Sequence, residues 1–224
     1  MYVTIPDQDM FQTPVGDLES CTPKIPETRL KEGRFLYLEG DEVEWLYQVT
    51  SGVVLLSRLL ADGRRQVIAF GYPGDIIGFP SRGLHHTDCM SLTDVRLQPY
   101  RRAHLESGEG DPKLHLALLN AALLEISAMQ DHFMMLGRKS AIEKLASFLC
   151  VFSERVGEDL GPFRQITLPM SRSDIADFLG LTTETVSRTF TQLRKAGIIS
   201  TDKSDAVVIL KPTALLGLSL GDED

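Results

Sequence analysis

Three polar side chains with the spacing of one helix face lie in the stretch LTTETVSRTFTQL, residues 181–193. Glu184, Ser187 and Arg188 would share one side of a helix, because residues three and four apart are neighbours there. A guanidinium can donate two hydrogen bonds to guanine, and a carboxylate can accept one from cytosine. An exposed Glu–Arg pair four residues apart is also an ordinary helix stabiliser, worth about 0.3–0.5 kcal/mol. Both uses are compatible, because the glutamate can orient the arginine while each reads a base.

The residues around this segment have the pattern of a helix-turn-helix. Ala176, Gly180 and Val186 stand four and then six residues apart. The alanine lets the second helix approach closely, the glycine can adopt the left-handed turn conformation, and the valine is buried. The shared core is expected to contain Ile175, Leu179, Leu181 and Val186.

Capping residues mark where both helices begin. Ser171 can cap the first helix, with Asp174 three residues later as a near capping box, and Thr182 can cap the second. An ordinary helical hairpin would have similar caps. The polar face at the start of the second helix favours the DNA-reading motif, because a recognition helix meets base edges with its first turns.

Two short apolar stretches follow at once, in KAGIISTDKSDAVVILK, residues 195–211. We interpret them as two strands joined by a polar tip, which makes a wing. The predicted motif is therefore a winged helix-turn-helix whose wing rests near the phosphate backbone.

The net charge of the chain, −8 over 224 residues, at first argues against a nucleic-acid partner. Its distribution argues otherwise. Residues 161–211 hold 7 Lys and Arg against 5 Asp and Glu, whereas residues 1–160 hold 16 against 23. A basic face on the helix-turn-helix therefore remains possible.

The first half of the chain differs in composition and in the pattern of its apolar residues. Residues 1–26 contain four prolines and are expected to form an irregular arm. From Arg34 to Tyr100, short β-branched and aromatic runs alternate with Gly, Pro and Asp-Gly, and Leu60–Arg65 has the composition of a hairpin tip. This pattern predicts an antiparallel roll or barrel.

A long amphipathic helix is predicted from Pro112 onward. Its apolar residues recur at three- and four-residue steps, in a wide stripe of Leu114, Leu118, Leu119, Ala122, Leu123, Ile126, Met129, Phe133 and Leu136. The stripe could pack entirely on its own domain. We favour a dimer seam, because one side can cover the roll while the other meets a partner chain.

The predicted fold class is α+β, in three parts. An arm and a β-roll resembling a cyclic-nucleotide-binding domain occupy residues 1–110, a dimerisation helix 111–138, and a winged helix-turn-helix domain 139–224. A second helix is expected over Ser140–Gly157, before a Gly/Pro-rich connection.

Several classes of protein are disfavoured. No apolar run approaches the roughly 20 residues of a membrane-spanning helix, and the beginning of the chain lacks the basic and apolar pattern of a signal peptide. We therefore expect a cytoplasmic protein without a membrane partner. We find no G-x-S-x-G, phosphate-loop, H-E-x-x-H or paired-carboxylate signature, so we do not expect an enzyme.

The order of roll, long helix and winged helix-turn-helix resembles the CRP/FNR superfamily of bacterial transcription regulators. PGDIIG, residues 73–78, is similar to the glycine turn of its cyclic-nucleotide-binding roll, and SRSDIADFLGLTTETVSR, residues 171–188, is similar to its DNA-binding signature. Within that signature, ETVSR is the pattern of the FNR and FixK type. In the cAMP-receptor type, an Arg would stand at Thr183 and a Gly at Ser187.

The resemblance implies a homodimer that binds a palindromic double-stranded operator with TTGA-type half-sites and contacts RNA polymerase. Glu184, Ser187 and Arg188 would make the base contacts. Backbone or flanking contacts are implied for Arg172, Thr182 and Thr183.

The sensor half departs from the family pattern. The position of the ribose-binding Glu holds Phe79, and that of the phosphate-binding Arg aligns with His85, although Arg82 lies nearby. A buried phosphate without its charged partners is costly, so we do not expect cyclic-nucleotide binding.

The cysteines are also too few for the iron–sulfur centre of the oxygen-sensing FNR proteins. Such a centre needs four thiolates, whereas this chain has three cysteines, and they are far apart: Cys21, Cys89 and Cys150. Cys150 is expected to pack in a core. HHTDC, residues 85–89, holds four possible metal ligands at poor spacing, and we interpret it as a loop of solvated polar residues.

These observations favour a FixK-type activator of genes for microaerobic respiration, denitrification or nitrogen fixation, without an obligate cofactor. The alternative is a ligand- or redox-gated regulator that holds haem, a metal or a small molecule in the roll.

Overall fold

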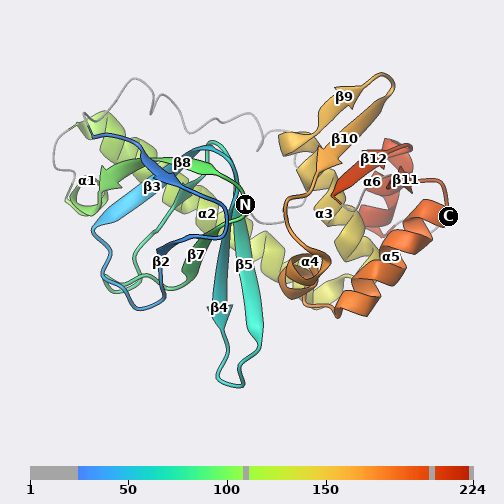
Figure 1. Ribbon diagram of the computed structural model, residues 1–224, viewed down its shortest axis with the longest axis horizontal. Coiled ribbons are helices and arrows are strands. Elements are labelled where there is room, and N and C mark those ends of the chain that lie inside the picture. The colour runs from blue at the N-terminus through green and yellow to red at the C-terminus, as the bar shows by residue number, and fades with distance from the viewer. Residues whose placement is uncertain (1–24, 108–110, 202–204, 222–224) are drawn as a thin grey trace. The chain divides into compact units, whose positions relative to one another are not determined.

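The computed structural model describes residues 25–107, 111–201 and 205–221, which form two compact units (Figure 1). The first unit ends at Met129 and the second begins at Gln130, so the division falls inside helix α2 (Pro112–Arg138). The expected dimerisation helix therefore contributes residues to both units. The predicted arm and Cys21 lie outside the described residues, apart from the last two residues of the arm.

The first unit contains eight strands among its described residues. They are β1 (Thr28–Leu30), β2 (Phe35–Tyr37), β3 (Trp45–Ser51), β4 (Val54–Leu59), β5 (Arg65–Gly71), β6 (Ile76–Ile77), β7 (Asp88–Ser91) and β8 (Val95–Arg101). These strands form two antiparallel sheets, ordered β1-β8-β3-β6 and β2-β7-β4-β5. The predicted antiparallel roll is confirmed. A short helix, α1 (Arg102–Glu106), follows β8 and was not predicted.

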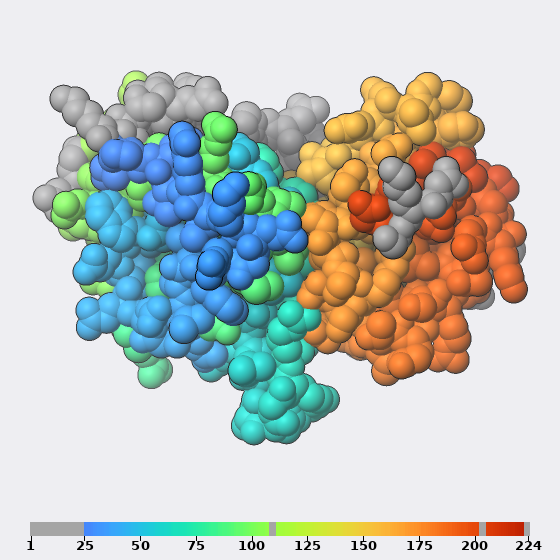
Figure 2. Space-filling view, in the orientation of Figure 1, coloured from blue at the N-terminus to red at the C-terminus, as the bar shows by residue number. Residues whose placement is uncertain are grey.

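Strands β4 and β5 form a hairpin whose tip is the predicted turn. Leu60 N donates to Arg64 O at 2.8 Å, and Gly63 N donates to Leu60 O at 2.9 Å. The tip extends away from the body of the first unit in the space-filling view (Figure 2). Leu59 is 60% exposed there, although it is apolar.

The HHTDC segment is not the solvated polar loop that we expected. His85 is buried and its ring stacks on Tyr37, with the ring centroids 3.5 Å apart. Cys89 lies in β7 and is fully buried, because alternate residues of a strand point to the same face and this face covers the core. Burial raises the pKa of the Cys89 thiol to about 12. His86 is the exposed ring, 3.1 Å from an Arg58 nitrogen.

Helix α2 carries the predicted wide apolar stripe, with one side buried and the other exposed. Its inward face, built on Leu114, Leu118 and Ala121, is buried in one cluster with Leu46 and Tyr100 of the roll. Seven large apolar side chains of α2 are 40–74% exposed, namely Leu116, Leu119, Leu123, Ile126, Met129, Phe133 and Met134. None of the described helices is long and apolar enough to span a membrane.

The second unit combines a small sheet with four further helices over its described residues. The helices are α3 (Ala141–Val156), α4 (Arg172–Leu179), α5 (Thr183–Lys195) and α6 (Pro212–Leu220); the strands are β9 (Glu158–Leu160), β10 (Phe163–Thr167), β11 (Ile199–Ser200) and β12 (Ala206–Ile209). The sheet order is β11-β12-β10-β9. Ser140 and Gly157 cap the two ends of α3, in agreement with the helix predicted over Ser140–Gly157. Strand β9 and helix α6 were not predicted.

The last turns of α2 pack into the core of this second unit. The ring of His132 stacks on Phe178 of α4 with centroids 4.4 Å apart, and Phe178 meets Phe148 of α3 edge to face. Cys150 is buried in α3 as expected, and burial raises the pKa of its thiol to about 11. Helix α4 is therefore held against both α2 and α3 through aromatic contacts.

Candidate nucleic-acid interface

The turn between α4 and α5 is built from local hydrogen bonds that the sequence predicted. Ser171 Oγ accepts from the backbone N of Asp174 at 3.1 Å, and Asp174 Oδ2 accepts from the backbone N of Ser171 at 2.8 Å. Gly180 ends α4 in the left-handed conformation, with φ 62° and ψ 42°. Thr182 begins α5, because its Oγ1 accepts from Thr185 N at 3.1 Å. The two helices are thus bounded by side-chain and glycine caps, as expected.

The core between the two helices is mostly the predicted one. Ala176 and Val186 are at most 1% exposed, so α5 can lie close to α4 where the small residue stands. Ile175 and Leu179 are fully buried. Leu181 is only partly buried, which differs from the prediction. It stands in the turn between Gly180 and the cap of α5, where the chain passes along the surface.

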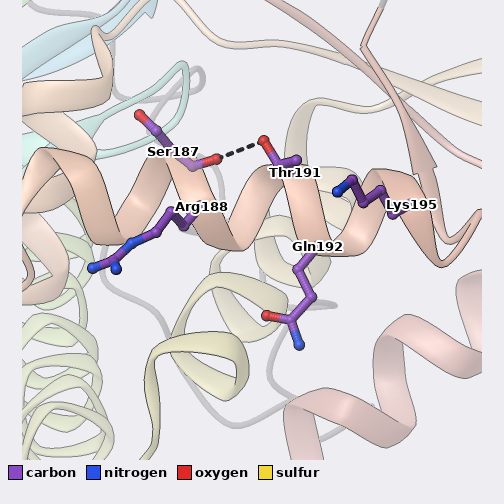
Figure 3. Close-up of a pocket in the computed structure, with 5 residues that line it drawn as sticks. All are labelled: Ser187, Arg188, Thr191, Gln192 and Lys195. Atoms are coloured by element: carbon purple, nitrogen blue, oxygen red, sulfur yellow. Dashed lines mark hydrogen bonds between the residues drawn. The ribbon is translucent and has the colours of Figure 1, made fainter.

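The three predicted base-reading side chains are exposed together on α5. Glu184, Ser187 and Arg188 all lie in its first two turns. The structure extends this face toward the carboxyl end of the helix, because Ser187 and Arg188 line an open hollow with Thr191, Gln192 and Lys195 (Figure 3). These last three residues were not predicted. Their spacing of 7, 8 and 11 residues from Glu184 could have revealed them, since it continues the same helix face.

The hydrogen bonding of the predicted Glu–Arg pair is different from the direct pairing that we considered. Arg188 Nη2 donates to Thr185 Oγ1 at 3.4 Å. The pKa of the Glu184 carboxyl is lowered, first because the backbone N–H of Glu184 donates to it and then because the Thr182 hydroxyl does; the charge of Arg188 acts last. The guanidinium of Arg188 is therefore bonded to a threonine rather than to Glu184.

Arg172, Thr182 and Thr183 were expected to make backbone or flanking contacts. Thr182 and Thr183 are exposed at the start of α5. Arg172 is partly buried, and its guanidinium lies 3.4 Å from the centroid of the Phe190 ring. Burial lowers the pKa of Arg172. The arginine thus joins the first turn of α4 to the middle of α5 by a cation–π contact.

The two strands of the predicted wing are present. Strand β12 pairs with β11 and with β10, so the two strands of the wing belong to the sheet β11-β12-β10-β9. Leu168 N donates to Asp205 O at 2.7 Å beside it. Residues 202–204 of the polar tip lie outside the described part of the chain.

Two family models match this chain, one in each half. A cyclic nucleotide-binding domain matches residues 27–107, and a Crp-like helix-turn-helix domain matches residues 143–218. The second match contains α4, the turn and α5, together with the strands of the wing.

FixK proteins are similar to this chain over most of its length. The nitrogen fixation regulation protein FixK of Rhizobium meliloti is 39% identical over 91% of this chain and 92% of its own length. The FixK of Azorhizobium caulinodans is 41% identical over 79% of this chain and 73% of its own. The solved structure of FixK2 from Bradyrhizobium japonicum has a TM-score of 0.79 and 36% identity over 86% of this chain and 96% of its own. With this similarity and with a capped helix-turn-helix whose second helix has an exposed polar face, the chain belongs to the CRP/FNR family of DNA-binding transcription regulators.

Proposed function

We propose that this protein is a homodimeric transcription activator of the FixK type that recognises a palindrome of TTGA-type half-sites. Its targets are genes for microaerobic respiration, denitrification or nitrogen fixation. The printed function of the FixK relatives, nitrogen fixation regulation, supports the choice of genes. The ETVSR sequence of the recognition helix supports the choice of half-site.

The observation that carries this proposal is the exposed face at the start of α5. Glu184, Ser187 and Arg188 provide an acceptor, a hydroxyl and a double donor, and none of them is buried in the second unit. An arginine suits the O6 and N7 atoms of guanine, and a glutamate suits the amino group of cytosine. A helix in the major groove presents its first turns to base edges.

The exposed face of α2 supports a homodimer. Leu116, Leu123 and Gln130 are spaced by seven residues, and so are Leu119, Ile126 and Phe133. These two series are the a and d positions of a coiled coil, and they lie opposite the face that is buried against the roll. A second copy of the helix would cover the five exposed apolar side chains of these two series. Two subunits could then place their recognition helices about 34 Å apart, one turn of DNA.

Exposed apolar side chains at two hairpin tips support a contact with RNA polymerase. Leu59 and Leu60 stand at the end of the β4–β5 hairpin, 60% and 43% exposed. Leu160 and Phe163 border the turn of the β9–β10 hairpin, 48% and 37% exposed. Large side chains at exposed tips are suited to a protein partner, because burial in an interface removes their apolar surface from water.

We further propose that the roll needs no cofactor for DNA binding. Phe79, at the position of the family's ribose-binding acid, packs against an apolar cluster. Arg82 is exposed at the tip of a turn with φ 55°, while His85 is buried against Tyr37. A gated sensor with haem or a metal would instead give coloured protein with stoichiometric iron when it is purified without oxygen.

Selection of bound DNA from a random pool by the untreated, full-length protein tests the proposed function. We expect a two-fold symmetric consensus with TTGA-type half-sites and no requirement for an added ligand.

Arg188→Ala should lose about 1–3 kcal/mol of specific binding when it is titrated with the selected duplex, and it should relax the preference at one base pair. Unchanged affinity and unchanged base preference in that variant would contradict the assignment.

A second prediction concerns Lys195 at the carboxyl end of the recognition face. We expect its ammonium to contact a DNA phosphate, because it lines the same hollow as Ser187 and Arg188. Lys195→Ala should weaken binding to all sequences alike and reduce the slope of log K against log salt by about 1.

Arg194 provides the matched control for this measurement. It is also basic and exposed, but it is one residue away and therefore turned by about 100° around the helix. Arg194→Ala should leave the salt slope unchanged. If Lys195→Ala had the same salt slope as the protein without substitution, the ammonium of Lys195 would not contact a phosphate.

A further inference from the structure

A short series of hydrogen bonds runs from Arg188 across the amino-terminal turn of α5. Arg188 Nη2 lies 3.4 Å from Thr185 Oγ1, and Thr185 Oγ1 lies 3.0 Å from Thr182 Oγ1. The guanidinium is therefore held by a threonine hydroxyl that is itself in contact with the cap of the helix.

The known donors decide how the two hydroxyls are used. A guanidinium can only donate, so Thr185 Oγ1 accepts from Arg188. Thr182 Oγ1 accepts from the backbone N of Thr185 at 3.1 Å, and either hydroxyl can be the donor in the contact between the two threonines. The hydrogen bond from Arg188 is charge-assisted, and hydrogen bonds that share a group strengthen one another.

We propose that Thr185, supported by Thr182, is a positioning residue for base recognition: its hydroxyl holds the guanidinium of Arg188 in the arrangement that reads the half-site. This inference rests on the proposed function and names residues that set its specificity. Figure 3 shows the side chain of Arg188 directed toward the amino-terminal end of α5. Its Nη2 donates to Thr185 Oγ1, three residues earlier in the same helix.

The physical gain is preorganisation of a long side chain. An exposed arginine populates many rotamers, and immobilising it on DNA costs affinity. A guanidinium that is already held over the first turn of the helix loses less freedom when it meets guanine.

Thr185→Val is the decisive substitution, because it removes the hydroxyl and keeps the size and branching of the side chain. The cap of α5 remains, since Thr182 Oγ1 still accepts from the backbone N of residue 185. The full-length variant is titrated with a duplex that carries a TTGA-type palindrome and with duplexes altered at each base pair. We expect a loss of roughly three- to tenfold for the palindrome, the effect of one ordinary hydrogen bond, together with weaker discrimination at the base pair that Arg188 reads.

Three comparisons separate positioning from a general structural effect. Thr185→Ser keeps a hydroxyl and should restore both affinity and discrimination. Thr189→Val removes a hydroxyl that is bonded to the helix backbone, at Thr185 O and 2.8 Å, from a side chain that is 5% exposed; it should leave discrimination intact. In the Arg188→Ala background, Thr185→Val should have no further effect, because the side chain that it positions is gone.

Each other outcome has a distinct meaning. An equal loss from Thr185→Val with and without Arg188 would show that the threonine contacts DNA directly, and would overturn the proposal. Unchanged binding and discrimination by Thr185→Val would overturn it as well. If the protein without substitution bound the palindrome no better than a scrambled duplex, the proposed function itself would be wrong, and the role of the hydroxyls with it.

Discussion

Leu123→Glu is expected to convert the protein to a monomer and to weaken operator binding by roughly 100- to 10,000-fold. Leu123 is 55% exposed in the middle of the outer face of α2, at an a position of the heptad. In a symmetric dimer the same residue of the partner would lie opposite, so two carboxylates would meet in an apolar seam. Each subunit would then have to bind its half-site alone. Sedimentation gives the mass of the complex, and titration with the palindrome gives the affinity.

Leu124→Glu is the matched control for this experiment. The substitution and the residue type are the same, and Leu124 is also exposed, at 37%. It is turned by about 100° from Leu123 around the helix and belongs to neither heptad series. This variant should remain a dimer and keep its affinity for DNA. If Leu123→Glu were still dimeric, the seam would not lie where we place it. If it were monomeric with undiminished affinity, operator binding would not require the dimer.

The second large effect concerns pH and the histidine that joins α2 to α4. Burial is the main reason that the pKa of His132 is lowered to about 4, and the positive charge of Lys144 also disfavours its protonation; a hydrogen bond to the backbone of Phe178 opposes the shift. The ring is 6% exposed and is therefore neutral at pH 7. Between pH 6.5 and pH 4 the unfolded chain binds a proton at this residue and the folded chain does not.

The stability that His132 contributes is consequently complete above pH 6.5 and is lost as the pH falls toward 4. We expect the loss from this group to reach about 2 kcal/mol at pH 5. His132→Phe keeps an aromatic ring on Phe178 and cannot titrate, so its free energy of unfolding should fall less over the same interval. Urea unfolding followed by circular dichroism at pH 5 and pH 7 measures the difference. Parallel pH dependence in the two proteins would mean that His132 is not buried in its neutral form.

The features that sequence reasoning predicted well are those specified by residues close together along the chain. The caps at Ser171 and Thr182 and the left-handed Gly180 depend on partners within four residues. The β4–β5 turn and the ends of α3 are local in the same way. The side chains of Glu184, Ser187 and Arg188 share a face because the helix has 3.6 residues per turn, whatever lies around it.

Features that depend on distant partners were missed or placed differently. Strand β9 is short and fully exposed, and it is a strand because it pairs with β10. The burial of His85 and Cys89 depends on how two sheets close over them.

The sequence by itself therefore determined the order of elements, the helix-turn-helix with its caps, and the polar face at the start of α5, because short-range geometry governs all three. Only the tertiary structure decided which face of α2 is covered by the roll and which is left exposed. It also decided that the guanidinium of Arg188 is bonded to Thr185, because the choice among side-chain rotamers depends on the hydrogen bonds available in the folded helix.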